Sequence, residues 1–180
     1  VFIGCSMEMV LDILSERLDR PVGDDFADKF HDDLHASMRL ELDPITGVHD
    51  AITKIQALDR VGGVCVASNG EPESIRTSLG AVGLLPFFGD GLFTARDAGR
   101  AKPHPGLFLH AAREMNFAPE NCIVVEDSVH GVNAACAAGM LVFGYASDAQ
   151  PEKLCDHRLS IAGAKIFMTM DELPALIAGA

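Results

Sequence analysis

The chain beyond residue 60 alternates short apolar runs with segments of helical periodicity, and this alternation restricts the fold more than any other feature. Mostly apolar runs of this length are typical of strands buried on both faces, as in a parallel sheet covered by helices. We therefore expect an α/β fold in which helices cover both faces of a parallel sheet. The expected strands are residues 61–67, 92–94, 122–125, 141–143 and 166–168.

The first 42 residues show helical periodicity only. A stripe of apolar side chains at helical spacing runs from residue 7 to residue 18, and Arg20-Pro21 ends it. Apolar side chains then recur every four residues from Phe26 to Met38, which predicts a second amphipathic helix. Two such helices form a hairpin that is too small to be a domain alone. We expect a boundary near Asp43, with residues 1–42 and 43–180 as separate units.

Charge and cysteine content exclude several classes of protein. The chain has 14 Lys and Arg residues against 26 Asp and Glu, a formal charge of −12, which disfavours binding to nucleic acid or to an anionic membrane. A phosphate site in such a chain needs its own local positive charge. The five cysteines form no C-x-x-C pair, which argues against a zinc site and favours a reducing, cytoplasmic location. The oligomeric state cannot be predicted from the sequence.

Two polar clusters follow a predicted strand or precede a predicted helix. Ser68-Asn69-Gly70 offers a hydroxyl and backbone amides that suit a phosphate oxygen, although an ordinary turn with serine as a helix cap would look the same. In Lys102-Pro103-His104-Pro105, two prolines stiffen the loop that carries the lysine. The lysine either supplies charge to a phosphate site or is a surface residue beside helix-starting prolines.

A third cluster, Glu126-Asp127-Ser128, follows the most apolar of the predicted strands. Adjacent carboxylates at the end of a buried strand are costly unless water or a cation neutralises them, and carboxylate oxygens suit Mg²⁺. Asp127 alone is explained equally well as a helix cap, but Glu126 is not. Because ligands of parallel sheets bind at the carboxyl ends of the strands, the three clusters together predict a phosphate and Mg²⁺ site.

These clusters resemble three motifs of the haloacid dehalogenase (HAD) superfamily, in order and in spacing. Residues 66–70 resemble its second motif, residues 102–105 its third and residues 124–132 its fourth, in the branch that contains β-phosphoglucomutase and sugar-phosphate phosphatases. The resemblance implies a HAD-like Rossmannoid core over residues 43–180 and a partial helical cap over residues 1–42.

The resemblance also implies a role for each cluster. Ser68 and backbone amides near Asn69 and Gly70 would bind the transferring phosphoryl group, and Lys102 would neutralise its charge. Asp127 would bind Mg²⁺ directly, and Glu126 directly or through water. The substrate would be a small phosphorylated metabolite.

The first motif of that family, D-x-D-G-T at the end of the central strand, is absent, and no D-x-D occurs in the chain. In the family the first of these aspartates is the nucleophile and the second is the general acid and base. The sequence starts abruptly in an apolar stretch, so we expect this motif and its strand to lie upstream of Val1. We further expect the 180-residue chain to be inactive, to bind Mg²⁺ weakly and to be marginally stable.

Three functions fit the motifs that are present. The first is a Mg²⁺-dependent phosphatase that hydrolyses small phosphorylated metabolites, sugar phosphates among them, through an aspartyl-phosphate. The second is a phosphomutase of the β-phosphoglucomutase type, which shares every motif found here. The third is a non-catalytic homologue that binds a phosphorylated ligand. The exact substrate is left open by the sequence.

Overall fold

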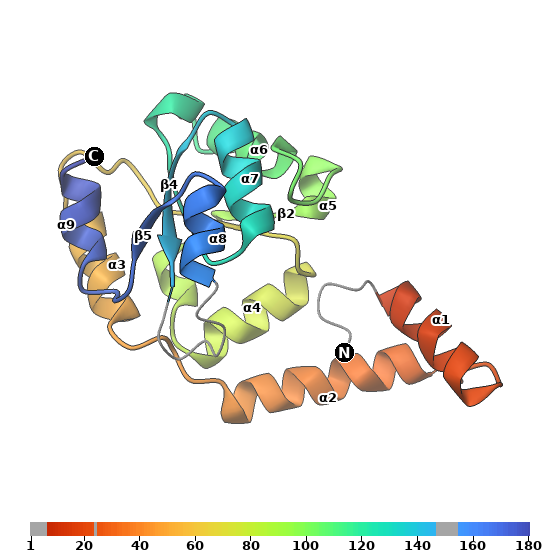
Figure 1. The fold of residues 1–180 in the computed structure, drawn as a ribbon. Helices are drawn as coiled ribbons and strands as arrows, with labels where there is room; N and C mark the ends of the chain where they lie inside the picture. Colours follow the sequence, from red (N-terminus) through yellow and green to blue (C-terminus); the bar gives the residue numbers. More distant parts are fainter. Residues whose placement is uncertain (1–6, 24, 147–154) are drawn as a thin grey trace. The chain divides into compact units, whose positions relative to one another are not determined.

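The computed structural model describes residues 7–23, 25–146 and 155–180 (Figure 1). Contacts between Cα atoms divide the chain into two compact units, Val1–Leu42 and Asp43–Ala180. Strands in the second unit are parallel and alternate with helices, which confirms the α/β class. No helix in the described ranges is long and apolar enough to cross a membrane.

The first unit contains helices α1 (Met7–Leu18) and α2 (Phe26–Glu41). Along α2 the rings of Phe26 and Phe30 stack with their centroids 6.2 Å apart, as expected for side chains four residues apart on one helix face. Phe30 is nevertheless 43% exposed, so the apolar stripe of this helix is only partly covered. That this unit is part of a cap stays a prediction.

The strands of the second unit form two separate parallel sheets. One pairs β1 (Val66–Ser68) with β2 (Leu92–Thr94), and the other has the order β3 (Ile123–Glu126), β4 (Leu141–Tyr145), β5 (Lys165–Phe167). Among the described residues, β1 and β3 therefore each have one strand neighbour and one open edge. On β3, Val125 is 41% exposed although Val124 and Glu126 on either side of it are buried.

The first predicted strand was too long. Residues 61–67 were expected to be extended throughout, but pairing with β2 begins only at Val66, whose amide donates to the carbonyl of Gly91 over 2.8 Å. Upstream of it, a Cβ on Gly62 would lie 2.5 Å from the ring of Phe117. The Phe117 ring therefore packs closely against this glycine-containing segment, which pairs with no strand among the described residues.

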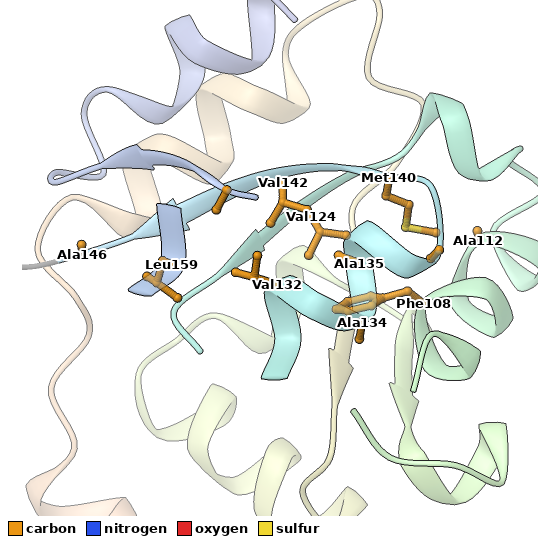
Figure 2. Packing of buried hydrophobic residues seen from close by; sticks show 12 residues of the cluster. Phe108, Ala112, Val124, Val132, Ala134, Ala135, Met140, Val142, Ala146 and Leu159 are labelled. Carbon is orange, nitrogen blue, oxygen red and sulfur yellow. The ribbon is translucent and has the colours of Figure 1, made fainter. Parts of the chain in front are cut away.

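Helices cover the three-stranded sheet on both faces, as predicted. Val142 of β4 packs into one apolar core and its neighbour Phe143 into a second, and consecutive residues of a strand point to opposite faces. Figure 2 shows the first core, in which Val124, Val132 and Leu159 pack together. The remaining elements are α3 (Val48–Gln56), α4 (Pro72–Ala81), η1 (Leu85–Phe87), α5 (Ala95–Ala98), α6 (Gly106–Glu114), η2 (Pro119–Asn121), α7 (Val129–Ala137), α8 (Cys155–Ile161) and α9 (Leu173–Ala178).

The two sheets share the first core. Ala67 of β1 packs against the cluster that contains Val124 of β3, and α6 contacts both strands of the smaller sheet. This common packing brings the loops that follow β1 and β3 toward the loop that precedes α6. The three polar clusters of the sequence lie on these loops.

Candidate active site

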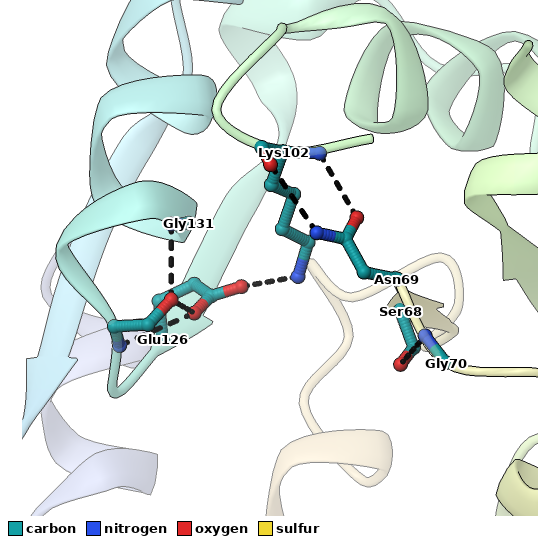
Figure 3. A network of polar contacts seen from close by, with 7 residues as sticks. Ser68, Asn69, Gly70, Lys102, Glu126 and Gly131 are labelled. Carbon is teal, nitrogen blue, oxygen red and sulfur yellow. Dashed lines mark hydrogen bonds and ion pairs between the residues drawn. The ribbon is translucent and has the colours of Figure 1, made fainter. Parts of the chain in front are cut away.

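The side-chain amide of Asn69 joins the loop after β1 to the loop before α6. Its Oδ1 accepts the backbone N–H of Lys102 over 2.9 Å, and its Nδ2 donates to the carbonyl of the same residue over 3.2 Å (Figure 3). Two hydrogen bonds from one planar amide set both the distance and the direction of the partner backbone. The sequence predicted phosphate contacts for backbone amides near Asn69 and Gly70, and gave no role to this side chain, which contacts the loop that carries the lysine.

The ammonium group of Lys102 then forms an ion pair with Oε1 of Glu126, the last residue of β3. The two side chains are only 11% and 8% exposed. A buried charge of either sign is costly without its partner, so each group requires the other. The same Nζ lies 4.8 Å from the centroid of the buried Phe108 ring, a cation–π contact that further restricts the lysine.

Glu126 is in turn oriented by the first turn of α7. The Ser128 hydroxyl donates to Oε2 over 3.0 Å, and the same oxygen atom of Ser128 caps the helix by accepting the N–H of Gly131 over 3.0 Å. A Cβ on Gly131 would lie 2.0 to 2.3 Å from the three atoms of the Glu126 carboxylate group. The carboxylate can occupy this position only because residue 131 has no side chain.

The Ser68 hydroxyl is held across the turn that follows β1. Its Oγ accepts the N–H of Gly70 over 3.1 Å, which fixes the side chain across the turn. Because this bond uses the hydroxyl as an acceptor, its O–H can be donated to an anion. Ser68 and Glu126 end β1 and β3, so both face the carboxyl edge of the sheets, where ligands of parallel sheets bind.

The carboxylates fit Mg²⁺ only in part. Asp127 is exposed and borders a hollow of about 220 Å³ that Val125, Tyr145 and Met170 also line. Its oxygens are the hard ligands that Mg²⁺ prefers, whereas Glu126 is engaged by Lys102 and Ser128. Among the described residues no group of three His, Cys, Asp or Glu side chains could hold a metal ion. Asp127 would therefore need further ligands, such as water and a phosphate oxygen.

The network contains functional contacts that the sequence did not reveal. Phe108 lies in the segment after the two prolines, and nothing in the sequence marks it as the ring beside the lysine. The requirement for glycine at residue 131 also went unnoticed, although a glycine in the first turn of a helix was a usable signal. The roles predicted for Ser68, Gly70 and Asp127 stay predictions.

Comparison with known proteins gives a consistent result. Residues 8–139 match the family described as haloacid dehalogenase-like hydrolase. The chain is 37% identical to 6-phosphogluconate phosphatase from Escherichia coli (strain K12) over 138 residues, which cover 76% of this chain and 57% of that protein. It is 30% identical to phosphoglycolate phosphatase from Nitrosococcus oceani over 137 residues, 71% of this chain and 58% of that protein. The chain thus spans less than two thirds of the length of either relative.

Two solved structures share the fold over nearly the whole chain. A haloacid dehalogenase-like protein from Agrobacterium tumefaciens has a TM-score of 0.77 and 32% identity, covering 98% of this chain and 78% of that one. A HAD family hydrolase from Deinococcus radiodurans, crystallised with phosphate and sodium, has a TM-score of 0.78 and 29% identity, covering 99% of this chain and 77% of that one.

Proposed function

Because the chain belongs to the haloacid dehalogenase-like hydrolase family, we propose that it forms the phosphate-binding part of a Mg²⁺-dependent phosphatase for small phosphorylated metabolites, sugar phosphates among them. The observation that carries the proposal is the Lys102–Glu126 ion pair. The backbone of its lysine is hydrogen-bonded to Asn69, which follows Ser68, and its carboxylate directly precedes the exposed Asp127. The chain has a formal charge of −12, so a phosphate site in it needs a local positive charge. In this proposal the restrained ammonium of Lys102 supplies that charge.

Each residue then has a defined task. The Ser68 hydroxyl and backbone amides near Asn69 and Gly70 bind the phosphoryl oxygens, and Lys102 neutralises their charge. Asp127 binds Mg²⁺, with Glu126 holding the lysine and reaching the metal at most through water. When bound, the metal neutralises charge on the phosphoryl group. The nucleophile is an aspartate of a D-x-D pair, which this chain does not contain.

The open edges of β1 and β3 suit the strand that would carry this pair. A parallel strand between them would end beside Ser68 and Glu126, so its terminal aspartate would meet the lysine. The aspartate would take the phosphoryl group as an aspartyl-phosphate, which water then hydrolyses. Residues 1–42 are proposed to form part of a cap in the same protein.

The relatives support a small phosphorylated substrate. Two of them are named for phosphatases of 6-phosphogluconate and phosphoglycolate, and one related structure contains bound phosphate. These names and the bound phosphate describe the relatives, and a product assay identifies the substrate of this protein.

The test is a product assay on the protein expressed from its complete reading frame, with a panel of sugar phosphates and phosphoglycolate in the presence of Mg²⁺. Inorganic phosphate as the product supports a phosphatase, whereas an isomerised sugar phosphate identifies a mutase. Neither product with any substrate, together with a reading frame that encodes no D-x-D upstream of residue 1, would leave ligand binding as the function. The 180-residue chain alone is expected to release no phosphate, because it contains no D-x-D.

A further inference from the structure

We propose that the side chain of Asn69 positions Lys102, by locking the lysine loop to the end of β1, rather than binding phosphate. The importance of this role for catalysis rests on the proposed function, but the contact itself does not. Its basis is the paired hydrogen bonds between the Asn69 side chain and the backbone of Lys102, across 33 residues of sequence.

The contact restrains the lysine at the end opposite its charge. A lysine side chain has a flexible four-carbon stem, so its ammonium is well placed only if the backbone and the charged tip are both restrained. Glu126 and the ring of Phe108 restrain the tip. Asn69 restrains the backbone. Because Asn69 directly follows Ser68, the last residue of β1, its bonds fix the backbone of Lys102 relative to that strand.

The result is a continuous set of contacts from one sheet to the other. It runs from β1 through Asn69 to the backbone of Lys102, then through the lysine side chain to Glu126 at the end of β3. β1 and β3 are not paired to each other by backbone hydrogen bonds. The polar contacts of Asn69 and Lys102 therefore set the spacing of the loops that follow the two strands.

Phosphate binding is the weaker account of the Asn69 side chain. Its only acceptor atom faces the N–H of Lys102, and one of its two N–H groups faces the carbonyl. An anion accepts hydrogen bonds only, so it would compete with the Lys102 carbonyl for that N–H. The remaining N–H can reach an anion only in the orientation that the two bonds with Lys102 impose.

Competitive acetylation of lysines in the 180-residue chain, read by mass spectrometry, tests the proposal without any turnover. In the unmodified protein, Lys102 should react far more slowly than the exposed Lys54. Asn69→Ala should raise the rate at Lys102 about tenfold relative to Lys54, the factor that corresponds to about 1.4 kcal/mol, roughly the worth of two exposed hydrogen bonds. Asn69→Asp keeps the acceptor but not the donor, so the acetylation rate of Lys102 in this variant should lie between the rates in the unmodified protein and in Asn69→Ala.

Gln56→Ala is the matched control. It removes another long-range amide bond, from Gln56 Nε2 to the carbonyl of Phe87 over 2.8 Å, and should leave Lys102 unchanged. Alkylation of the half-buried Cys65 thiol in the same samples reports general loss of fold. An unchanged Lys102 rate in Asn69→Ala would overturn the proposal, and so would a rise matched by Cys65. A failed phosphatase assay would leave these rates unaffected, so the two proposals fail separately.

Discussion

Replacement of Gly131 by alanine should remove the Glu126 carboxylate from the site. The new Cβ would lie 2.0 to 2.3 Å from the carboxylate atoms, more than 1 Å inside ordinary van der Waals contact, so a small shift cannot relieve the overlap. Glu126 must change rotamer and leave Lys102 unpaired in surroundings where the lysine is 11% exposed. Breaking a buried ion pair costs about 3–5 kcal/mol, and the helix propensity of alanine returns about 1, so we expect a net loss of about 2–4 kcal/mol.

Urea unfolding of the purified 180-residue chain measures this loss. Gly80→Ala is the matched control, because Gly80 is also in a helix and a Cβ there would meet nothing within 4 Å. The control should stabilise the chain by about 0.5–1 kcal/mol through helix propensity alone. In a Glu126→Ala background the overlap is gone, so adding Gly131→Ala should cost nothing further.

Two results would be incompatible with a Glu126 carboxylate packed against Gly131. One is a Gly131→Ala variant whose unfolding free energy lies within about 0.5 kcal/mol of the Gly80→Ala variant, a difference too small for a lost buried pair. The other is an equal loss from Gly131→Ala with and without the Glu126 side chain. Either would mean that the carboxylate does not occupy the space above Gly131.

Further predictions concern a helix cap, an acidic group and the cysteines. Ser128→Ala removes the cap of α7 and a hydrogen bond to Glu126, and should cost about 1–3 kcal/mol in urea unfolding; a loss below about 0.5 kcal/mol would contradict it. Hydrogen bonds from the hydroxyl and amide of Thr94 hold the pKa of Asp97 below its usual value. The stability that these bonds confer is therefore present above about pH 4, the pKa of an unperturbed aspartate, and is lost as the pH falls through the lowered pKa of Asp97 in the folded protein. Asp97→Asn should therefore flatten this part of the acid dependence of the urea midpoint, and an unchanged profile would count against the assignment. Burial raises the pKa of the Cys65 thiol, so at pH 8 iodoacetamide should modify Cys65 more slowly than the exposed Cys136, and the reverse order would be contrary to the structure.

The sequence predicted the order of the elements well where local pattern decides it. The apolar residues 122–125 become β3 with the polar cluster at its carboxyl end, and helices cover both faces of its sheet. It failed at residues 61–65, where two glycines carry no periodicity and the ring of Phe117, more than fifty residues away, packs against Gly62. Such a tertiary contact cannot be read from the local pattern.

The candidate site was predictable as a set of residues but not as a set of contacts. Ser68 and Glu126 were identified because each ends or follows a predicted strand of a parallel sheet, and Lys102 because its proline-stiffened loop precedes a predicted helix. Their partners depend on which loops meet in space. Lys102 and Glu126 are 24 residues apart, and Asn69 is 33 residues from the backbone it binds, distances over which no periodic pattern acts.

If Lys102 and Asp127 serve phosphoryl transfer with Mg²⁺, their loss should abolish turnover. The most direct test is the Mg²⁺-dependent release of phosphate by the protein expressed from its complete reading frame, compared with its Lys102→Met and Asp127→Asn variants. Turnover should disappear with chelation of the metal and fall at least about 100-fold in each variant, the order of effect of removing one electrostatic stabiliser. Turnover that persists without Mg²⁺, or that survives both substitutions, would contradict these roles.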